Sequence, residues 1–240
     1  MTHTSEPGDP IGPLLPAGWT APPRPVRAVM QGRLVRLEPL ALAHAEALHE
    51  ANLQDREGRN WTYMVYGPFD SLEAYRDWVA EVAGEDDPMF YTIVRQQDGQ
   101  PVGVASYMRI APDAGSIEVG HINFSPLLQR NPGATEAMVL MMKWAFEAGY
   151  RRYEWKCDAL NAPSRRAALR LGLSYEGVFR QATSYKGRNR DTAWYAAIDS
   201  EWPALRAAFE TWLDPANFDS AGQQKQSLSA LTRPILVNIG

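Results

Sequence analysis

The chain has 240 residues and a formal net charge of −4 at pH 7, with 45% hydrophobic and 22% charged residues. This composition excludes a chain without a folded core, and the acidic balance argues against a nucleic-acid-binding protein, which needs a basic surface. The longest apolar run, residues 137–142, is far too short to cross a membrane. Because a single cysteine, Cys157, cannot form an internal disulfide and the N-terminus lacks a secretion-signal pattern, we expect a cytoplasmic protein with no membrane partner.

The two ends of the chain differ in composition from its middle. Residues 1–32 hold seven of the 18 prolines. Since proline fixes φ and donates no hydrogen bond, this segment predicts an arm without helix or central strand. Residues 214–240 are rich in Gln and Ser and predict an irregular tail. No internal repeat or second linker interrupts residues 33–213, so we expect one domain there.

Between these ends, apolar residues alternate between the period of two that is typical of strands and the longer period that is typical of helices. Ser71 is a residue type that caps helix N-termini, and residues 97–100 and 186–189 have the composition of hairpin turns. In chain order we predict a strand at 33–40, helices at 42–51 and 72–82, strands at 90–94, 102–110 and 116–124, a helix at 134–148, a strand at 152–157, a helix at 161–171, strands at 175–185 and 191–198, and a helix at 202–213.

This order of elements indicates a mixed α/β sheet, antiparallel at first and then built by right-handed crossovers through two helices. A loop that feeds a helix N-terminus presents unpaired N–H groups and the positive end of the helix dipole. The segment before the helix at 134–148 therefore predicts an anion site at residues 129–136. Strands joined by that helix are parallel neighbours, so a ligand there would face their carboxyl ends.

Two motifs make this prediction more specific. The run QRNPGATEA at residues 129–137 resembles the Q/R-x-x-G-x-G/A signature, with its A-T-E-A continuation, of the GNAT superfamily of acyl-CoA N-acyltransferases. Asn161-x-x-Ser164, with Gly172 eleven residues after the asparagine, resembles the second signature of the RimJ/RimL-type branch. The resemblance extends over residues 32–213 and implies a GNAT-like sheet of about seven strands flanked by helices, splayed between the fourth and fifth strands. It also implies acetyl-CoA, or another acyl-CoA, as co-substrate.

The first signature departs from the family pattern at one position. Pro132 stands where the signature normally has its first glycine, and proline has no N–H to offer a phosphate. We therefore expect the backbone amides of Arg130, Asn131, Gly133 and Ala134 to hold the diphosphate, with help from the Arg130 side chain.

The resemblance also implies catalytic roles. Backbone N–H groups around Asn123 and Phe124 would polarise the thioester carbonyl. Many members use a tyrosine seven residues after the motif asparagine as the acid, but Ala168 occupies that position here, and the serine of the RimJ/RimL branch, Ser164, is the candidate donor. Glu118 is the candidate that takes the amine proton. The residues expected to bind the co-substrate are Asn123, Phe124, Gln129, Arg130, Asn131, Gly133, Ala134, Thr135, Asn161, Ser164 and Arg165.

Several of these residues also have a purely structural interpretation. Asn161 and Ser164 have the pattern of a helix N-terminus, and Glu118 has the pattern of an ion-paired strand carboxylate. Arg165, Arg166 and Arg170 lie on a helix face that is usually solvated, with the 3′-phosphate of the nucleotide as the alternative partner of Arg165 or Arg166. The four histidines show no metal-ligand spacing, so we predict no metal, and Cys157 is interpreted as a buried apolar group.

The sequence thus predicts a monomeric or homodimeric N-acetyltransferase. It would transfer the acetyl group of acetyl-CoA to a primary amine by direct attack on the thioester. The acceptor is a protein N-terminus, a lysine, an amino acid or a small amine, and the loops at 54–69 and 186–191 would choose among them. Two alternatives stay open: transfer of a succinyl or other acyl group, and a CoA-binding module without catalysis. A nucleic-acid partner is not expected.

Overall fold

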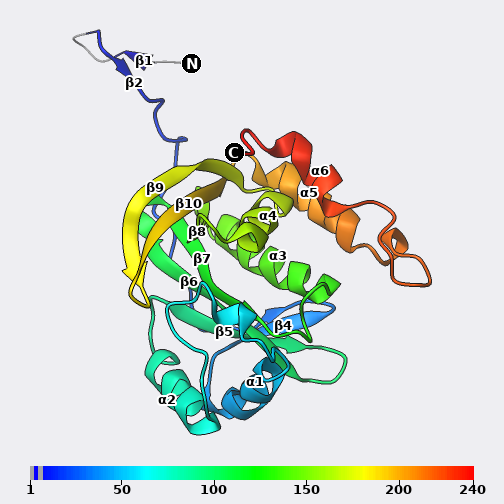
Figure 1. The fold of residues 1–240 in the computed structure, drawn as a ribbon. Coiled ribbons are helices and arrows are strands. Elements are labelled where there is room, and N and C mark those ends of the chain that lie inside the picture. The colour runs from blue at the N-terminus through cyan, green and yellow to red at the C-terminus, as the bar shows by residue number, and fades with distance from the viewer. Residues whose placement is uncertain (1–2, 5–7) are drawn as a thin grey trace.

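The computed structural model describes residues 3–4 and 8–240. One eight-stranded sheet, in the order β3-β4-β5-β6-β7-β8-β10-β9, forms the centre of the described part of the chain (Figure 1). All neighbouring strands are antiparallel except β7 and β8, which are parallel. The mixed α/β class is confirmed. The strand beyond the predicted seven is β3 (Met30–Gln31), which pairs with β4 at the edge of the sheet.

The elements follow the predicted order along the chain. The short strands β1 (His3–Thr4) and β2 (Pro10–Ile11) pair only with each other. The remaining strands are β4 (Val35–Pro39), β5 (Met89–Arg95), β6 (Pro101–Ala111), β7 (Ser116–Phe124), β8 (Arg152–Asp158), β9 (Ser174–Tyr185) and β10 (Arg188–Ile198). The helices are α1 (Ala45–Asn52), α2 (Leu72–Val82), α3 (Pro132–Glu147), α4 (Ala162–Arg170), α5 (Trp202–Leu213) and α6 (Leu228–Thr232), with a 3-10 turn, η2, at Arg59–Trp61.

Local chemistry explains where several elements begin. Ser71 caps α2 as predicted, because its side chain accepts a hydrogen bond of 3.1 Å from the Ala74 N–H. The hairpin between β9 and β10 turns through two residues rather than the predicted four. Lys186 and Gly187 both have positive φ, 47° and 72°, which is the geometry of a type I′ turn and lets β10 begin at Arg188.

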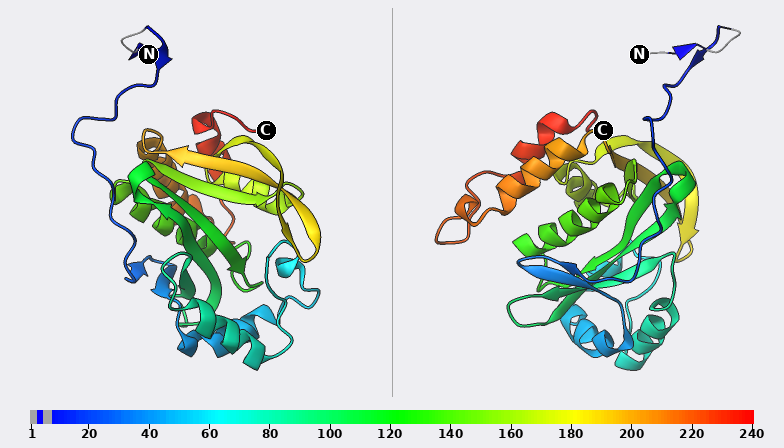
Figure 2. Two further views of the ribbon diagram at one scale, coloured as in Figure 1. Left: turned by 90° about the vertical axis from the view of Figure 1, so that its left-hand side faces the viewer. Right: turned by 180° about the vertical axis from the view of Figure 1, so that it is seen from behind.

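Helices cover the two faces of the sheet unequally. One face packs against α3, α4, α5 and α6, and the other carries only α1 and α2, at the end of the sheet near β4 and β5 (Figures 1 and 2). In the left view of Figure 2, β9 and β10 lie in front with the helices behind them. The larger apolar core lies on the α3 face, and a smaller one joins α1 and α2 to Trp61, Phe90 and Val104. The sheet therefore has an open region on the α1–α2 face.

Parts of the N-terminal arm and of the C-terminal tail contact the larger core. In the arm, the Pro23 carbonyl accepts a hydrogen bond from the Tyr150 hydroxyl at 3.1 Å. In the tail, the composition did not indicate the short helix α6, whose Leu228 and Thr232 are buried. The Val237 N–H donates to the Ser174 hydroxyl at 3.0 Å. None of the helices in the described residues is long and apolar enough to span a bilayer.

Candidate active site

The two parallel strands separate part-way along their length. β7 and β8 are paired from Ser116 opposite Arg152 to Val119 opposite Trp155, and no further. Beyond that point β7 continues to Phe124 and β8 continues to Asp158. The predicted separation between the fourth and fifth strands is therefore present.

A bulge bends β7 at this point. Between the pairs Ser106–Gly120 and Val104–Asn123, β7 has one more residue than β6. His121 lies in this bulge with a φ of 50°, in the left-handed region that few residues other than glycine adopt. Since a bulge turns the strand and re-aims its side chains, the His121 ring packs against Tyr66 and Phe90, with ring centres 5.6 and 5.0 Å away.

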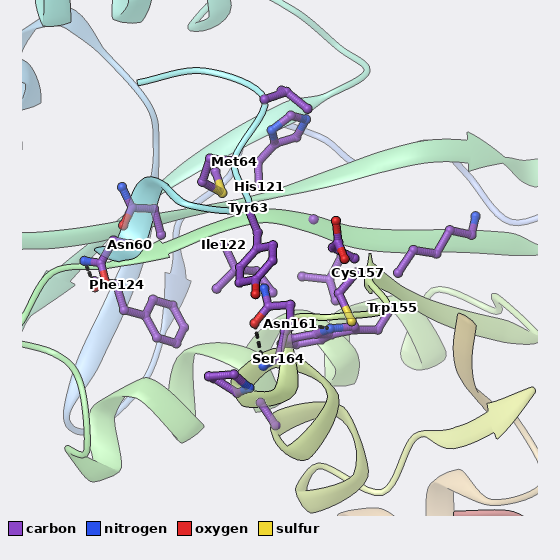
Figure 3. Close-up of a pocket in the computed structure, with 18 of the residues that line it drawn as sticks. Asn60, Tyr63, Met64, His121, Ile122, Phe124, Trp155, Cys157, Asn161 and Ser164 are labelled. Atoms are coloured by element: carbon purple, nitrogen blue, oxygen red, sulfur yellow. Dashed lines mark hydrogen bonds between the residues drawn. The ribbon is translucent and has the colours of Figure 1, made fainter. Parts of the chain in front are cut away.

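A cavity of about 850 Å³ lies where the strands part, bounded by β7, β8, β10, the η2 loop, the loop before α3 and the start of α4 (Figure 3). Of the residues predicted to form the site, it brings together Glu118, Asn123, Phe124, Gln129, Arg130, Asn161 and Ser164. The predicted residues that do not line it are Asn131, Gly133, Ala134, Thr135 and Arg165.

The expected amide cradle is mostly occupied by the chain itself. Pro132 is the first residue of α3, so Asn131 becomes the N-cap. Its side chain accepts from the Gly133 N–H at 2.8 Å, and its carbonyl accepts from the Ala134 N–H at 3.0 Å. The Asn131 N–H donates to the Leu128 carbonyl at 3.2 Å. Within the part of the chain that the structure describes, Arg130 is the one member of the four whose N–H has no partner.

The rest of the first signature stabilises the fold. Gln129 donates from its side-chain amide to the Phe124 carbonyl and to Asn60, both at 2.8 Å, which ties the η2 loop to the end of β7. Thr135 is buried and accepts a hydrogen bond from Arg170 at 3.0 Å. Thr135 was expected in the phosphate site. In the structure its side chain instead faces α4, and α3 begins two residues earlier than predicted.

The second signature contributes both to the N-cap of α4 and to the lining of the cavity. The Asn161 side chain accepts from the Ser164 N–H at 3.1 Å and so caps α4. Both residues also line the cavity (Figure 3). The Ser164 hydroxyl accepts from the indole N–H of Trp155 at 2.9 Å and interacts with the neighbouring Cys157 thiol. Capping and ligand contact, two alternatives at the level of sequence, are compatible in the structure.

Of the two arginines of α4 that were candidates for the 3′-phosphate, one lines the cavity. Arg165 donates to the Tyr195 hydroxyl at 3.0 Å and to the Ala159 carbonyl at 3.3 Å. Arg166 lines the cavity instead. The two are adjacent on α4, so the rotation of the helix about its axis decides which one faces the site.

Glu118 is buried between two cations. Its carboxylate oxygens lie 2.7 Å from the guanidinium of Arg109 and 2.7 Å from the ammonium of Lys156. Lys156 also pairs with Glu154 at 2.7 Å. Burial raises the pKa of the Glu118 carboxyl, and the two cations act in the opposite direction. Each oxygen of the candidate base is thus in an ion pair, and only Oε1 accepts a hydrogen bond from a described residue, Arg109.

His121 is a site residue that the sequence did not single out, whereas Tyr63 lies in the loop at 54–69 that was expected to border the acceptor. His121 lines the cavity, and its pKa is lowered to about 4, mainly by burial and then by Arg109 and Arg190. The imidazole is therefore neutral at pH 7. The sequence signal that could have indicated His121 was its position on the strand at 116–124, which the resemblance assigns to the site. The Tyr63 hydroxyl crosses from the η2 loop to donate to the Leu160 carbonyl at 3.2 Å (Figure 3).

The cysteine in the cavity is not activated. Cys157 lines the site, but burial raises the pKa of its thiol, which remains protonated at neutral pH. Among the described residues, no group of three or more His, Cys, Asp or Glu side chains is arranged to hold a metal ion.

Known proteins resemble the chain in sequence and in fold. Residues 34–174 match the family model described as "Acetyltransferase (GNAT) domain". The chain belongs to the GNAT acetyltransferase family. A GCN5-related N-acetyltransferase from Brucella melitensis has 44% sequence identity and a TM-score of 0.88, with 90% of this chain and 99% of that chain covered.

Two further relatives support membership of the GNAT family. A probable acetyltransferase of the family from Chromobacterium violaceum ATCC 12472 has 41% identity and a TM-score of 0.76, with 83% of this chain and 100% of that chain covered. The uncharacterized N-acetyltransferase YnaD of Bacillus subtilis (strain 168) is 26% identical over 141 residues, which are 58% of this chain and 81% of YnaD.

Acetyl-CoA is the co-substrate of the GNAT acetyltransferases, and the residues of the cavity fit it. Past Trp155, the backbone groups of β8 that face β7 have no strand partner, and an extended arm with two amide groups is complementary to such an edge. The free N–H of Arg130 and the side chains of Arg130 and Arg166 supply donors and positive charge for phosphates.

Proposed function

We propose that this GNAT protein transfers the acetyl group of acetyl-CoA to a primary amine by direct attack of the amine on the thioester. The observation that carries the proposal is the cavity between the diverging ends of β7 and β8, with the N-cap of α4 on one side and the bulge of β7 on the other. When bound, acetyl-CoA supplies an activated acetyl group. The RimJ/RimL-type assignment is part of the proposal and rests on Asn161 and Ser164.

The co-substrate would bind at the end of the cavity near α3 and α4. Arg130 would hold the diphosphate through its backbone N–H and its guanidinium, with Arg166 as the second cation. Asn131 already accepts hydrogen bonds from the N–H groups of Gly133 and Ala134. Fewer backbone donors are therefore free, and phosphate binding would depend more on side chains here than the family signature implies. The edge of β8 from Lys156 to Asp158 would pair with the amides of the pantetheine arm.

Each chemical step has a candidate group in the chain. A new C–N bond forms as the C–S bond breaks, and the sulfur leaves as a thiolate. A backbone N–H of β7 near Asn123 and Phe124 would polarise the carbonyl. The Ser164 hydroxyl, oriented by the Trp155 indole, would donate a proton to the sulfur. A thiolate with a pKa of about 8.5 is a good leaving group, so a weak acid suffices.

Two groups at the other end of the cavity can take the proton that the amine loses. Glu118 was expected from the sequence, and it can act only by giving up a contact with Arg109 or Lys156 or by way of water. His121 is neutral and needs no such exchange. The base is thus proposed to be one of these two, and single substitutions of each resolve which one sets the pH dependence of turnover.

Measurement of thiol release tests the proposal. Purified protein, acetyl-CoA or succinyl-CoA, and a panel of amines are mixed, and the product is identified by mass. Acetylated amine with acetyl-CoA supports the proposal, whereas a preference for succinyl-CoA would replace the acetyl group by a larger one. If acetyl-CoA raises the melting temperature and no amine is ever acylated, the protein is a CoA-binding module, an outcome consistent with the buried Ala168 in place of the family's tyrosine.

We also propose a cytoplasmic location, because the single cysteine is buried as a free thiol. A monomer or homodimer is the proposed state, and light scattering on the purified protein measures it.

A further inference from the structure

Arg190 is a cation in the cavity without a counter-ion. It lies on β10, lines the cavity, and has no ion-pair partner among the described residues. Its Nε is buried and makes no hydrogen bond to any described residue. Its nearest aromatic neighbour, Tyr185, has its ring centre 6.0 Å from the guanidinium carbon. The Arg190 side chain is half-buried, and a guanidinium whose Nε is shielded from water without a hydrogen-bond partner indicates a ligand that supplies an acceptor.

The register of the sheet places Arg190 on the face that carries Glu118. Glu118 lies opposite Glu154, and Lys156, two residues further along β8, lies opposite Trp194 of β10. Side chains alternate along a strand, so Arg190 shares the face of Trp194. Arg109, Glu118, His121, Lys156 and Arg190 therefore form one end of the cavity, which we call the acceptor end. The signature residues Gln129 and Arg130 form the other end.

The carboxylates near the acceptor end already have partners. Glu118 is paired with Arg109 and Lys156, and Glu154 with Lys156. Asp158 accepts from the Tyr185 hydroxyl at 2.9 Å and from the Leu160 N–H at 2.8 Å. The three cations Arg109, Lys156 and Arg190 are thus matched in number by three carboxylates, but Arg190 makes an ion pair with none of them. Arg109 and Arg190 both contribute to lowering the pKa of His121, as expected for cations near one imidazole.

We infer that the acceptor is an amine that also carries a carboxylate, and that Arg190 binds that carboxylate. The planar guanidinium can donate two parallel hydrogen bonds to it. The inference rests on the proposed acetyl transfer and narrows its acceptor to one chemical class.

The carboxylate can be the α-carboxylate of a free amino acid or an acidic side chain at the start of a peptide. The test compares kcat/KM for amino acids with that for their α-amides, and for amidated peptides that begin with Asp with those that begin with Asn. Each pair keeps the amine and removes one negative charge. The variants are Arg190→Gln and, as a matched control on the neighbouring strand β9, Arg180→Gln, which changes an exposed arginine outside the cavity.

We expect the wild-type protein to prefer the acidic member of at least one pair by 10-fold or more. Arg190→Gln should lower kcat/KM for that member by about 10- to 100-fold, mainly through KM, and leave the amide little changed. Arg180→Gln should keep the wild-type preference. Equal use of the acid and the amide by the wild-type protein, or an equal loss on both in Arg190→Gln, would overturn the inference.

A binding measurement separates this inference from the proposed transfer. Calorimetry with N-acetyl amino acids and their amides needs no turnover. Carboxylate-dependent binding that Arg190→Gln abolishes supports the inference even if no amine is acetylated, and in that case only the proposed transfer fails. Acetylation of neutral amines, with no carboxylate preference in binding or turnover, would leave the transfer intact and refute the inference alone.

Discussion

Ser164→Ala distinguishes a proton donor from a helix-capping residue. The substitution keeps the backbone N–H that donates to Asn161, and it removes the hydroxyl that accepts from Trp155 at 2.9 Å. Trp155 is 6% exposed, so its indole N–H loses its partner in a buried place. An unsatisfied buried donor costs roughly 1–2 kcal/mol, which is the expected loss in the free energy of unfolding.

The effect on turnover should depend on pH. A general acid contributes at least about 100-fold in typical enzymes, and a thiolate needs less help, so we expect kcat to fall by about 10- to 100-fold at pH 7. Above the thiol pKa of about 8.5 the sulfur can leave as the anion, and the defect should shrink there. The Kd for acetyl-CoA should change less than kcat.

Trp155→Phe is the matched control, because it removes the indole N–H and leaves the serine hydroxyl in place. It should reduce stability with a smaller pH-dependent loss in kcat than Ser164→Ala, because the hydroxyl remains and loses only the indole that orients it. Urea unfolding and initial rates of thiol release at pH 6.5 to 9.5 measure both quantities. If Ser164→Ala lost stability but kept wild-type kcat at every pH, the serine would be a structural residue only, and the proposed acid would be wrong.

Three further predictions follow from single contacts. Asn161→Ala removes the N-cap of α4 and should cost about 1 kcal/mol of stability while weakening acetyl-CoA binding by calorimetry; unchanged binding would leave Asn161 as a cap alone. The Glu136 carboxylate accepts three hydrogen bonds from the N–H groups of residues 33–35, at 3.1, 2.6 and 2.8 Å, and Glu136→Gln weakens them. The free energy of unfolding in urea should fall by roughly 2–4 kcal/mol, whereas the exposed control Glu210→Gln should change it very little. The pKa of His121 is lower in the folded state, about 4, than in the unfolded chain, so the unfolded state binds the extra proton between these values. Wild-type stability should therefore fall by up to about 3 kcal/mol as pH drops from 6.5 to 4 relative to His121→Gln, and parallel pH profiles for the two proteins would contradict the burial of a neutral imidazole.

The secondary structure was largely predictable because it depends on local patterns. The helix α5 was predicted with its observed bounds, Trp202–Leu213, and the cap at Ser71 was predicted from residue type. The two-residue strand β3 and the five-residue helix α6 are too short to produce a periodic signal. Such short elements form because neighbouring strands and helices supply their partners.

The location of the site was predictable from the sequence, but its free N–H groups and the orientation of its side chains were not. Two motifs located the cavity between β7 and β8, because their residues are consecutive or separated by a fixed helical spacing. Which N–H groups remain free depended on where α3 begins, and Pro132 moved that point by two residues. Which arginine faces the cavity depended on the rotation of α4, so Arg166 replaced Arg165.

The sequence by itself determined the order of strands and helices, the family resemblance and the segments that meet at the cavity, since each of these depends on residues close together in the chain. Only the tertiary structure decided the charges at the acceptor end. Arg109, Glu118, Lys156 and Arg190 come from β6, β7, β8 and β10. Pairing between side chains so distant in sequence depends on sheet register and on the bulge at His121, and no local pattern specifies either.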